Sequence, residues 1–162
     1  MRTKNNVYVS LSAGAQKTLA LDAVKRRRIE ACGILIGTID SAGSWLIETA
    51  IPLRNIHDSP TYFEFAPEDL LAVELANPGK IVGAYHSHPS GYARPSQTDR
   101  QNMQRVNESQ RIPWAWLIIC GPFPSEPVNA SQHRWSLPAS SILAYHHFPG
   151  EGLRAVPVLF AS

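Results

Sequence analysis

The chain has 162 residues, of which 44% are hydrophobic and 17% charged, and this composition is typical of a folded globular protein rather than a disordered one. That length suits one domain with a sizeable core, so we expect a single domain over residues 1–162. The net charge of +2 is too small to indicate binding to nucleic acid or to a membrane surface.

The cysteines and the apolar runs do not suggest an exported or a membrane protein. Cys32 and Cys120 each lie in an apolar run, which predicts small core side chains rather than a disulfide framework or a nucleophile. No apolar run approaches the ~18 residues that a membrane span requires, and residues 7–11 are too short and too polar for a signal sequence. Because a reducing compartment suits unpaired cysteines, we expect a cytoplasmic protein.

The chain begins with a short strand and a helix. Residues 7–11 alternate in polarity as a strand does, and Ser12 can cap a helix that runs to about Arg28. The four cations at 25–28 are then interpreted as a solvated helix end, where positive charge suits the helix dipole. Residues 31–39, which are dense in isoleucine and leucine, predict a buried strand.

A hairpin and a second helix follow. After a turn that contains glycine, residues 45–53 predict a strand antiparallel to the first buried one. Residues 54–61 form a loop, and residues 62–65 predict a short strand. Pro67 opens a second helix that ends near Asn77.

The remaining elements complete a layered domain. Residues 80–88 predict a strand that the next residue, a proline, ends, and Ser96 opens a third helix. Residues 114–120 predict a central strand, and weaker strand patterns lie at 133–137 and 156–160. Strands interleaved with helices indicate an α/β (α+β) domain with a mixed sheet.

The residues best suited to bind a metal lie where the strand at 80–88 ends and shortly after it. On a strand, residues two apart point to the same face, so His86 and His88 present two imidazoles side by side. Asp99 arrives on the first turn of the third helix. Two imidazoles and one carboxylate form a typical catalytic zinc set, which leaves the fourth coordination place for water.

Two further interpretations of these polar residues stay open. Ser96 and Asp99 also have the spacing of a capping box, which would explain both residues without a metal. Ser87 is expected to point away from the imidazoles and support the strand, and Tyr92 and Arg94 are expected on the rim of the site. Four histidines lack an acidic partner at ligand spacing and are interpreted as surface or satisfied side chains: His57, His133, His146 and His147.

These motifs together resemble a known family. The sequence His-Ser-His-Pro at 86–89, followed after six residues by Ser-x-x-Asp at 96–99, resembles the signature of the JAMM (JAB/MPN) zinc metallopeptidases. The stretch Glu-Ala-Cys-Gly at 30–33 is similar to the Glu-x-Cys-Gly stretch of that family. The resemblance covers about residues 7–121 and extends only loosely over residues 122–162, and small stand-alone bacterial members match it best.

The resemblance implies a fold and a set of roles. The fold would be the cytidine-deaminase-like JAB/MPN fold, a curved mixed sheet flanked by helices. One Zn²⁺ per chain would be held by His86, His88 and Asp99. Glu30 would act as the general acid and base, and Ser96 would stabilise the oxyanion. Without the resemblance, Glu30 is better explained as a helix-end glutamate in a salt bridge with Arg27 or Arg28.

The resemblance also implies a class of substrate. Members of known activity cleave the amide bond after the C-terminal glycine of a ubiquitin-like β-grasp protein, whose extended tail can pair with a strand edge. In bacteria such partners include sulfur-carrier proteins and the ubiquitin-like proteins of anti-phage conjugation operons. The short loop at 54–61 favours a compact enzyme over a ubiquitin-chain specialist.

Two alternatives come from other functional classes. A non-catalytic scaffold of this fold would typically have lost metal ligands, and a DNA-associated relative would typically carry interleaved basic and aromatic residues.

Overall fold

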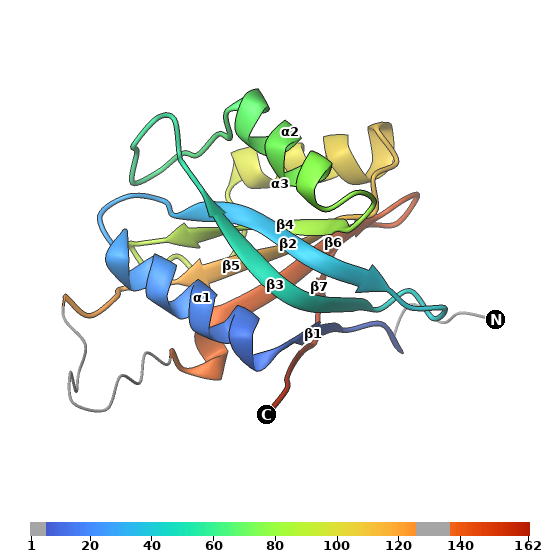
Figure 1. Ribbon diagram of the computed structural model, residues 1–162, viewed down its shortest axis with the longest axis horizontal. Coiled ribbons are helices and arrows are strands. Elements are labelled where there is room, and N and C mark those ends of the chain that lie inside the picture. The colour runs from blue at the N-terminus through green and yellow to red at the C-terminus, as the bar shows by residue number, and fades with distance from the viewer. Residues whose placement is uncertain (1–5, 126–136) are drawn as a thin grey trace.

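The computed structural model describes residues 6–125 and 137–162, in which a mixed eight-stranded sheet carries helices on both faces (Figure 1). The expected layered α/β fold is therefore confirmed. The strands are β1 (Val9–Leu11), β2 (Cys32–Ile39), β3 (Trp45–Leu53), β4 (Ile81–His88), β5 (Ala115–Cys120), β6 (Ile142–Phe148), β7 (Gly152–Val156) and β8 (Val158–Phe160). Their order in the sheet is β7-β6-β5-β4-β2-β3-β1-β8.

The strand that carries the histidines is central. β4 pairs antiparallel with β2 and parallel with β5, so both of its edges are covered. β2 and β3 form the expected hairpin, and their register shifts by a bulge between Ile36 and Gly37. Because β4 has neighbours on both sides, its backbone is held firmly where its last residues leave the sheet.

The two edge strands of the sheet are consecutive in the chain. β7 pairs with β6 at one edge and β8 pairs with β1 at the other, and only Pro157 separates β7 from β8. The Pro157 carbonyl accepts the Val9 N–H at 2.9 Å, which continues the pairing through the change of partner. The sheet must therefore curve until its edges meet, and the expected curvature is confirmed.

Helices cover the sheet unequally. α1 (Ala13–Lys25) lies across one face, and α2 (Pro67–Ala76) and α3 (Gln97–Gln104) lie over the other (Figure 1). A π-helical turn, Arg105–Ser109, extends α3. The α1 side buries a core that includes Leu19, Ala23, Leu35, Trp45 and Leu117. The opposite core includes Ile34, Val73, Met103, Val106 and Trp116.

Two of the strand expectations need correction. Residues 62–65 form no strand, because the Tyr62 carbonyl and the Glu64 N–H are bonded to the side chain of Asn55 instead of to a neighbouring strand. The expected strand at 156–160 is divided between β7 and β8, and β6 was not foreseen, although its side chains alternate between buried and half-buried. Of the pattern at 133–137, residues 133–136 lie outside the described residues.

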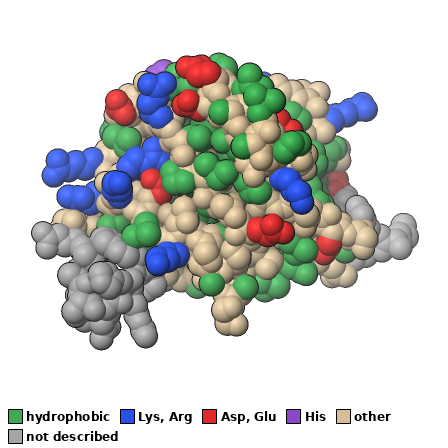
Figure 2. All heavy atoms as spheres, in the orientation of Figure 1, with side chains coloured by type: hydrophobic (Ala, Val, Ile, Leu, Met, Phe, Trp, Pro, Cys, Tyr) green, Lys and Arg blue, Asp and Glu red, His purple; other side chains and the backbone are tan. Residues whose placement is uncertain are grey.

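The interpretation of residues 25–28 as a solvated helix end is only partly right. α1 ends at Lys25, three residues early, and Lys25 and Arg28 are exposed. Figure 2 shows Lys and Arg side chains gathered on the left of this view, around the C-terminal end of α1. Arg26 instead turns inward and pairs with Asp22.

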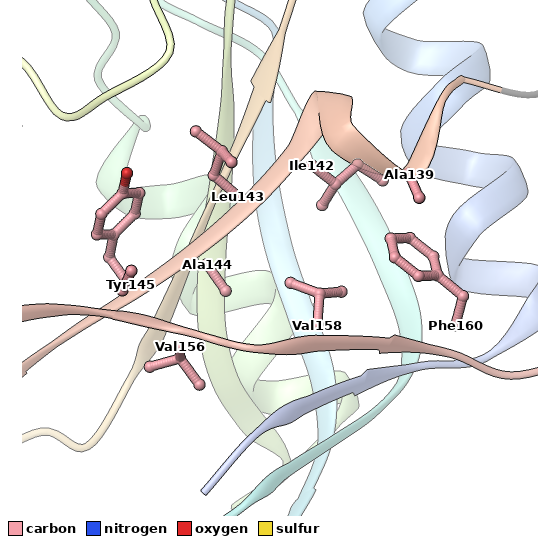
Figure 3. Close-up of a pocket in the computed structure, with 9 residues that line it drawn as sticks. Ala139, Ile142, Leu143, Ala144, Tyr145, Val156, Val158 and Phe160 are labelled. Atoms are coloured by element: carbon pink, nitrogen blue, oxygen red, sulfur yellow. The ribbon is translucent and has the colours of Figure 1, made fainter. Parts of the chain in front are cut away.

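A hollow of apolar character lies where β6 and β8 diverge. It has a volume of about 260 Å³, and Ile142, Val158 and Phe160 line it from the two strands (Figure 3). Among the residues that the structure describes, its lining includes no charged residue and no histidine.

Candidate metal centre and catalytic pocket

The two histidines of β4 point to one face of the sheet, as their spacing predicts. His86 is 1% exposed and His88 is 7% exposed, and their Nε2 atoms lie 3.1 Å apart. The intervening Ser87 points the other way, where its hydroxyl accepts the Ala31 N–H at 2.8 Å and ties β4 to the start of β2. The expected supporting role of Ser87 therefore fits the structure.

The ring of His88 is oriented by the loop that follows it. Its Nδ1 lies 2.7 Å from the Tyr92 carbonyl, and a carbonyl only accepts, so Nδ1 must carry the proton. Neutral His88 therefore presents a bare lone pair at Nε2. The loop makes this approach at Gly91, where φ is +88° and an added Cβ would lie 2.7 Å from the Gly121 carbonyl oxygen.

Asp99 is both a helix cap and a neighbour of the histidines. The Ser96 hydroxyl accepts the Asp99 N–H, and Asp99 Oδ2 accepts the Ser96 N–H at 2.9 Å, which completes a capping box. The same Oδ2 atom lies 3.1 Å from Nε2 of both His86 and His88. The two interpretations of this spacing are therefore compatible, since the capping box aims the carboxylate at the imidazoles.

Glu30 reaches the same place from the start of β2. Its Oε1 lies 4.0 Å from His86 Nε2 and 3.9 Å from His88 Nε2. The side chain is almost completely buried, and Oε2 has no hydrogen-bond partner among the described residues. Within that part of the chain Glu30 forms no ion pair with Arg27 or Arg28, so the helix-end explanation does not hold.

Burial and close charges shift the pKa values of these groups. Burial raises the pKa of Glu30 to about 8. Burial also lowers the pKa of His86, whereas at His88 it is outweighed by Asp99 and by the Tyr92 carbonyl, so the pKa of His88 is raised. Burial would raise the pKa of Asp99, but the two histidines hold it well below its usual range.

These residues fit a zinc ion. Three electron-rich atoms, Nε2 of His86 and His88 and Oδ2 of Asp99, converge with 3.1 Å between each pair. Neutral His88, with its proton on Nδ1, turns a lone pair at Nε2 toward the carboxylate, and a cation between the two would relieve their repulsion. Ligands ~2.0 Å from a tetrahedral zinc stand about 3.3 Å from one another, close to the observed spacing.

A second set of possible metal donors overlaps the first. Glu30, His86 and His88 also lie close enough together to hold a metal. However, the Glu30 oxygen is almost 1 Å farther from the histidines than the Asp99 oxygen is. The shorter spacing favours Asp99 as the third ligand, with Glu30 set back from it.

The centre opens into a small pocket of about 190 Å³. Residues of the centre and of two loops line it together; the described lining is Glu30, Pro60, Thr61, His88, Ser90, Tyr92 and Ser96. Tyr92 was expected on this rim, and the Arg94 guanidinium lies 5.3 Å from the centre of its ring. Pro60, Thr61 and Ser90 were not foreseen, because nothing in the sequence of a loop shows which pocket it lines.

The other histidines stay outside the centre. His57 contacts Glu64 at 2.8 Å near the surface, and His147 lies 3.5 Å from Glu108. His146 is buried and bonded to the Trp114 carbonyl at 2.8 Å. His57 and His146 fit their interpretation as surface or satisfied side chains, whereas the Nδ1 atom of His147 is buried without a hydrogen-bond partner among the described residues. His133 lies outside the described residues.

Comparison with known proteins agrees with this geometry. The sequence model of the family described as prokaryotic homologs of the JAB domain matches residues 12–137. The chain belongs to this family. Membership of the JAB family, together with the donor set, makes it a zinc metallopeptidase, as the resemblance in sequence implied.

No helix within the described residues is long and apolar enough to cross a membrane.

Proteins with similar sequences include two that are named for a peptidase activity. It is 32% identical to the CysO-cysteine peptidase of Mycobacterium tuberculosis over 78% of its own length and 94% of that protein. It is 38% identical to the desampylase of Haloferax volcanii over 66% of its length and 70% of that protein.

Solved structures show the same fold. A protein from Desulfitobacterium hafniense aligns with a TM-score of 0.67 and 23% identity, over 95% of this chain and 93% of that one. A JAB1/MPN domain protein from Archaeoglobus fulgidus aligns with a TM-score of 0.51 and 21% identity, over 93% and 98%. The expected JAB/MPN fold is thereby confirmed.

Proposed function

We propose that this protein is a zinc isopeptidase or peptidase that hydrolyses the amide bond after the C-terminal glycine of a ubiquitin-like β-grasp protein. His86, His88 and Asp99 hold the metal, and Glu30 is the general acid and base. The observation that carries this proposal is the set of three donor atoms 3.1 Å apart, with a buried carboxylate oxygen 3.9–4.0 Å from the two imidazoles.

The residues around the centre suit each step of amide hydrolysis. A bound zinc ion would acidify a water molecule and polarise the substrate carbonyl. Glu30 Oε1 takes the proton of the attacking water and later gives it to the leaving nitrogen. The Ser96 hydroxyl accepts the Asp99 N–H, so its own hydrogen remains free to donate to the developing oxyanion. Burial of Glu30 keeps bulk water from competing for that proton.

The substrate class follows from the relatives and the pocket. One relative is named for CysO-cysteine and another for desampylation, and ubiquitin-like or sulfur-carrier proteins are the substrates we infer for this chain. A pocket of about 190 Å³ between two loops suits a narrow, extended tail, and glycine residues fit such a space best. Glu30, His86, His88, Ser96 and Asp99 are all present, whereas a non-catalytic scaffold would typically have lost metal ligands. Their presence favours an enzyme over a scaffold.

We place this activity in the bacterial cytoplasm. It would serve either the removal of a ubiquitin-like protein from conjugates, as in anti-phage defence, or the processing of a sulfur carrier. Genes beside this one distinguish the two: conjugating enzymes indicate the first, and biosynthetic enzymes indicate the second.

Replacing Glu30 by glutamine tests the proposal. The probe is a β-grasp sulfur-carrier protein fused through its C-terminal glycine to a short peptide, and cleavage is followed by mass spectrometry. We expect Glu30→Gln to keep about one zinc per chain by elemental analysis while kcat falls by roughly 10²–10⁴-fold. The exposed Glu48→Gln is the matched control and should cleave normally. An active Glu30→Gln enzyme would overturn the role of Glu30, and a zinc-free wild type would overturn the assignment of zinc to the centre.

A further inference from the structure

The two metal-facing histidines are held in different ways. Histidine ligands usually donate the N–H of their second ring nitrogen to a carbonyl or a carboxylate, which fixes the ring. His88 does so through Tyr92. His86 does not: its Nδ1 is buried and has no hydrogen-bond partner among the described residues. On the Nδ1 side, the His86 ring therefore depends on packing rather than on a hydrogen bond for its orientation.

An aromatic ring takes the place of that bond. Phe63 lies against His86 with ring centroids 4.6 Å apart and planes only 22° from parallel. Stacked rings at this distance attract each other and resist tilting. The stack lies on a flat face of the imidazole, so it restricts the rotation that would carry Nε2 away from His88 and Asp99.

Phe63 is itself held by a buried amide. Asn55 is 1% exposed; its Nδ2 donates to the Tyr62 carbonyl at 2.9 Å, and its Oδ1 accepts the Glu64 N–H at 3.3 Å. These two bonds bracket Phe63 on either side in the chain. The position of the aromatic ring is thus tied to the Asn55 side chain.

The same loop holds Glu30. Asn55 Nδ2 also donates to the Glu30 carbonyl at 3.1 Å, and the Glu30 N–H donates to the Ser59 carbonyl at 2.8 Å. Both backbone groups of Glu30 are therefore bound by residues 55–59. One side chain, that of Asn55, links the backbone of Glu30 to the aromatic ring that supports His86.

We infer that Asn55 and Phe63 are positioning residues that set the His86 ring and the Glu30 backbone together. Phe63 acts through His86, and Asn55 acts through both Phe63 and Glu30. The consequences for catalysis rest on the proposed function, whereas the consequences for zinc binding do not.

The role of Phe63 is tested by Phe63→Leu, with Phe65→Leu as the matched control. Phe65 belongs to the same segment and packs against the core beside α2 and α3. Its ring lies 5.6 Å from that of Phe63, whereas within the described residues the ring stacked on His86 is Phe63. Zinc affinity is measured by competition with a chromophoric chelator, and the His86 ring is followed by nitrogen NMR. We expect Phe63→Leu to bind zinc at least ~10-fold more weakly and to shift the His86 signals.

Phe63→Tyr keeps the aromatic face that stacks on His86, and it should bind zinc with an affinity close to that of the wild type. Phe65→Leu should leave affinity and ring signals unchanged even if it lowers the melting temperature. Unchanged zinc affinity and unchanged His86 signals in Phe63→Leu would overturn the role of Phe63.

The role of Asn55 is tested by Asn55→Ser against Asn107→Ser. Asn107 is equally buried and also makes four hydrogen bonds, to Ile112, Trp114, Trp116 and His147, but none to the metal centre. Both substitutions should reduce stability. We expect only Asn55→Ser to lower kcat, by roughly 10-fold or more with KM little changed, and to weaken zinc binding.

Equal effects of the two asparagine substitutions on kcat and on zinc affinity would overturn the role of Asn55. If the wild type cleaves no β-grasp fusion, the proposed function fails, yet the zinc and NMR comparisons still decide the positioning roles.

Discussion

At the scale of the residue, the capping box of α3 shows how one side chain serves two purposes. Asp99 Oδ2 accepts the Ser96 N–H and faces both imidazoles. A carboxylate can accept several hydrogen bonds at once, so capping does not compete with metal binding. The cap also fixes the side-chain rotamer, which keeps the oxygen at equal distance from His86 and His88.

Glu30 makes the stability of the zinc-free protein depend on pH. Burial raises its pKa from 4.5 to about 8, so between these values the folded chain binds more protons than the unfolded chain. Stability should therefore fall as pH rises through this window. Glu30→Gln removes the effect, and we expect it to be more stable than the wild type at pH 8 by roughly 1–4 kcal/mol.

Urea unfolding of chelated protein between pH 5 and pH 8 measures this difference, with Glu48→Gln as the control. The expectation is contradicted if the gap between Glu30→Gln and the wild type does not widen as pH increases.

At the scale of the element, α1 is joined to the sheet by a buried polar cluster. Arg26 binds both carboxylate oxygens of Asp22 at 2.6–2.7 Å and donates to the carbonyls of Cys32 and Leu53. The Tyr85 hydroxyl donates to Asp22 at 2.7 Å. Since Tyr85 directly precedes His86, the cluster anchors β4 on the face opposite the metal centre.

Two adjacent arginines allow a matched test of this cluster. Arg26→Ala would leave the Asp22 carboxylate buried beside Tyr85 without its cation, and we expect a loss of about 2–4 kcal/mol in unfolding free energy. Arg27→Ala, which removes a cation without a carboxylate partner in the described structure, should change stability by less than ~0.5 kcal/mol. Chemical denaturation measures both, and similar losses would show that the cluster is not specific.

At the scale of the whole molecule, closure of the sheet depends on its last strand. β8 covers the outer edge of β1, and the Leu11 carbonyl accepts the Ala161 N–H at 2.9 Å. None of the groups at the metal centre comes from β1 or β8. Stability and metal binding are therefore separable at this end of the molecule.

Deletion of residues 158–162 tests that separation. It should expose the edge of β1, lower the melting temperature by several degrees and promote association, because a free strand edge pairs with other chains. Deletion of Ser162 alone is the control. We expect the longer deletion still to bind about one zinc per chain at low temperature, and loss of zinc binding in a folded truncated protein would contradict this.

Much of the fold was predictable because its signals are local. The strands at 31–39, 45–53 and 80–88 were predicted within a residue at each end, since runs of apolar residues and turns mark them. The false strand at 62–65 and the unforeseen β6 have another cause. In both, the outcome depends on a distant partner, a buried amide in one case and the edge of β5 in the other.

The residues of the metal centre likewise fall into those placed by local sequence signals and those placed by contacts between distant elements. The strand period places His86 and His88 together, and the helix cap places Asp99 at the first turn of α3, so the sequence by itself determined where the three proposed donors lie within their own elements. Only the tertiary structure decided that Glu30 faces this set and that Asn55 and Phe63 hold it. Spacing determines geometry within one element, whereas approach between elements depends on packing across the sheet.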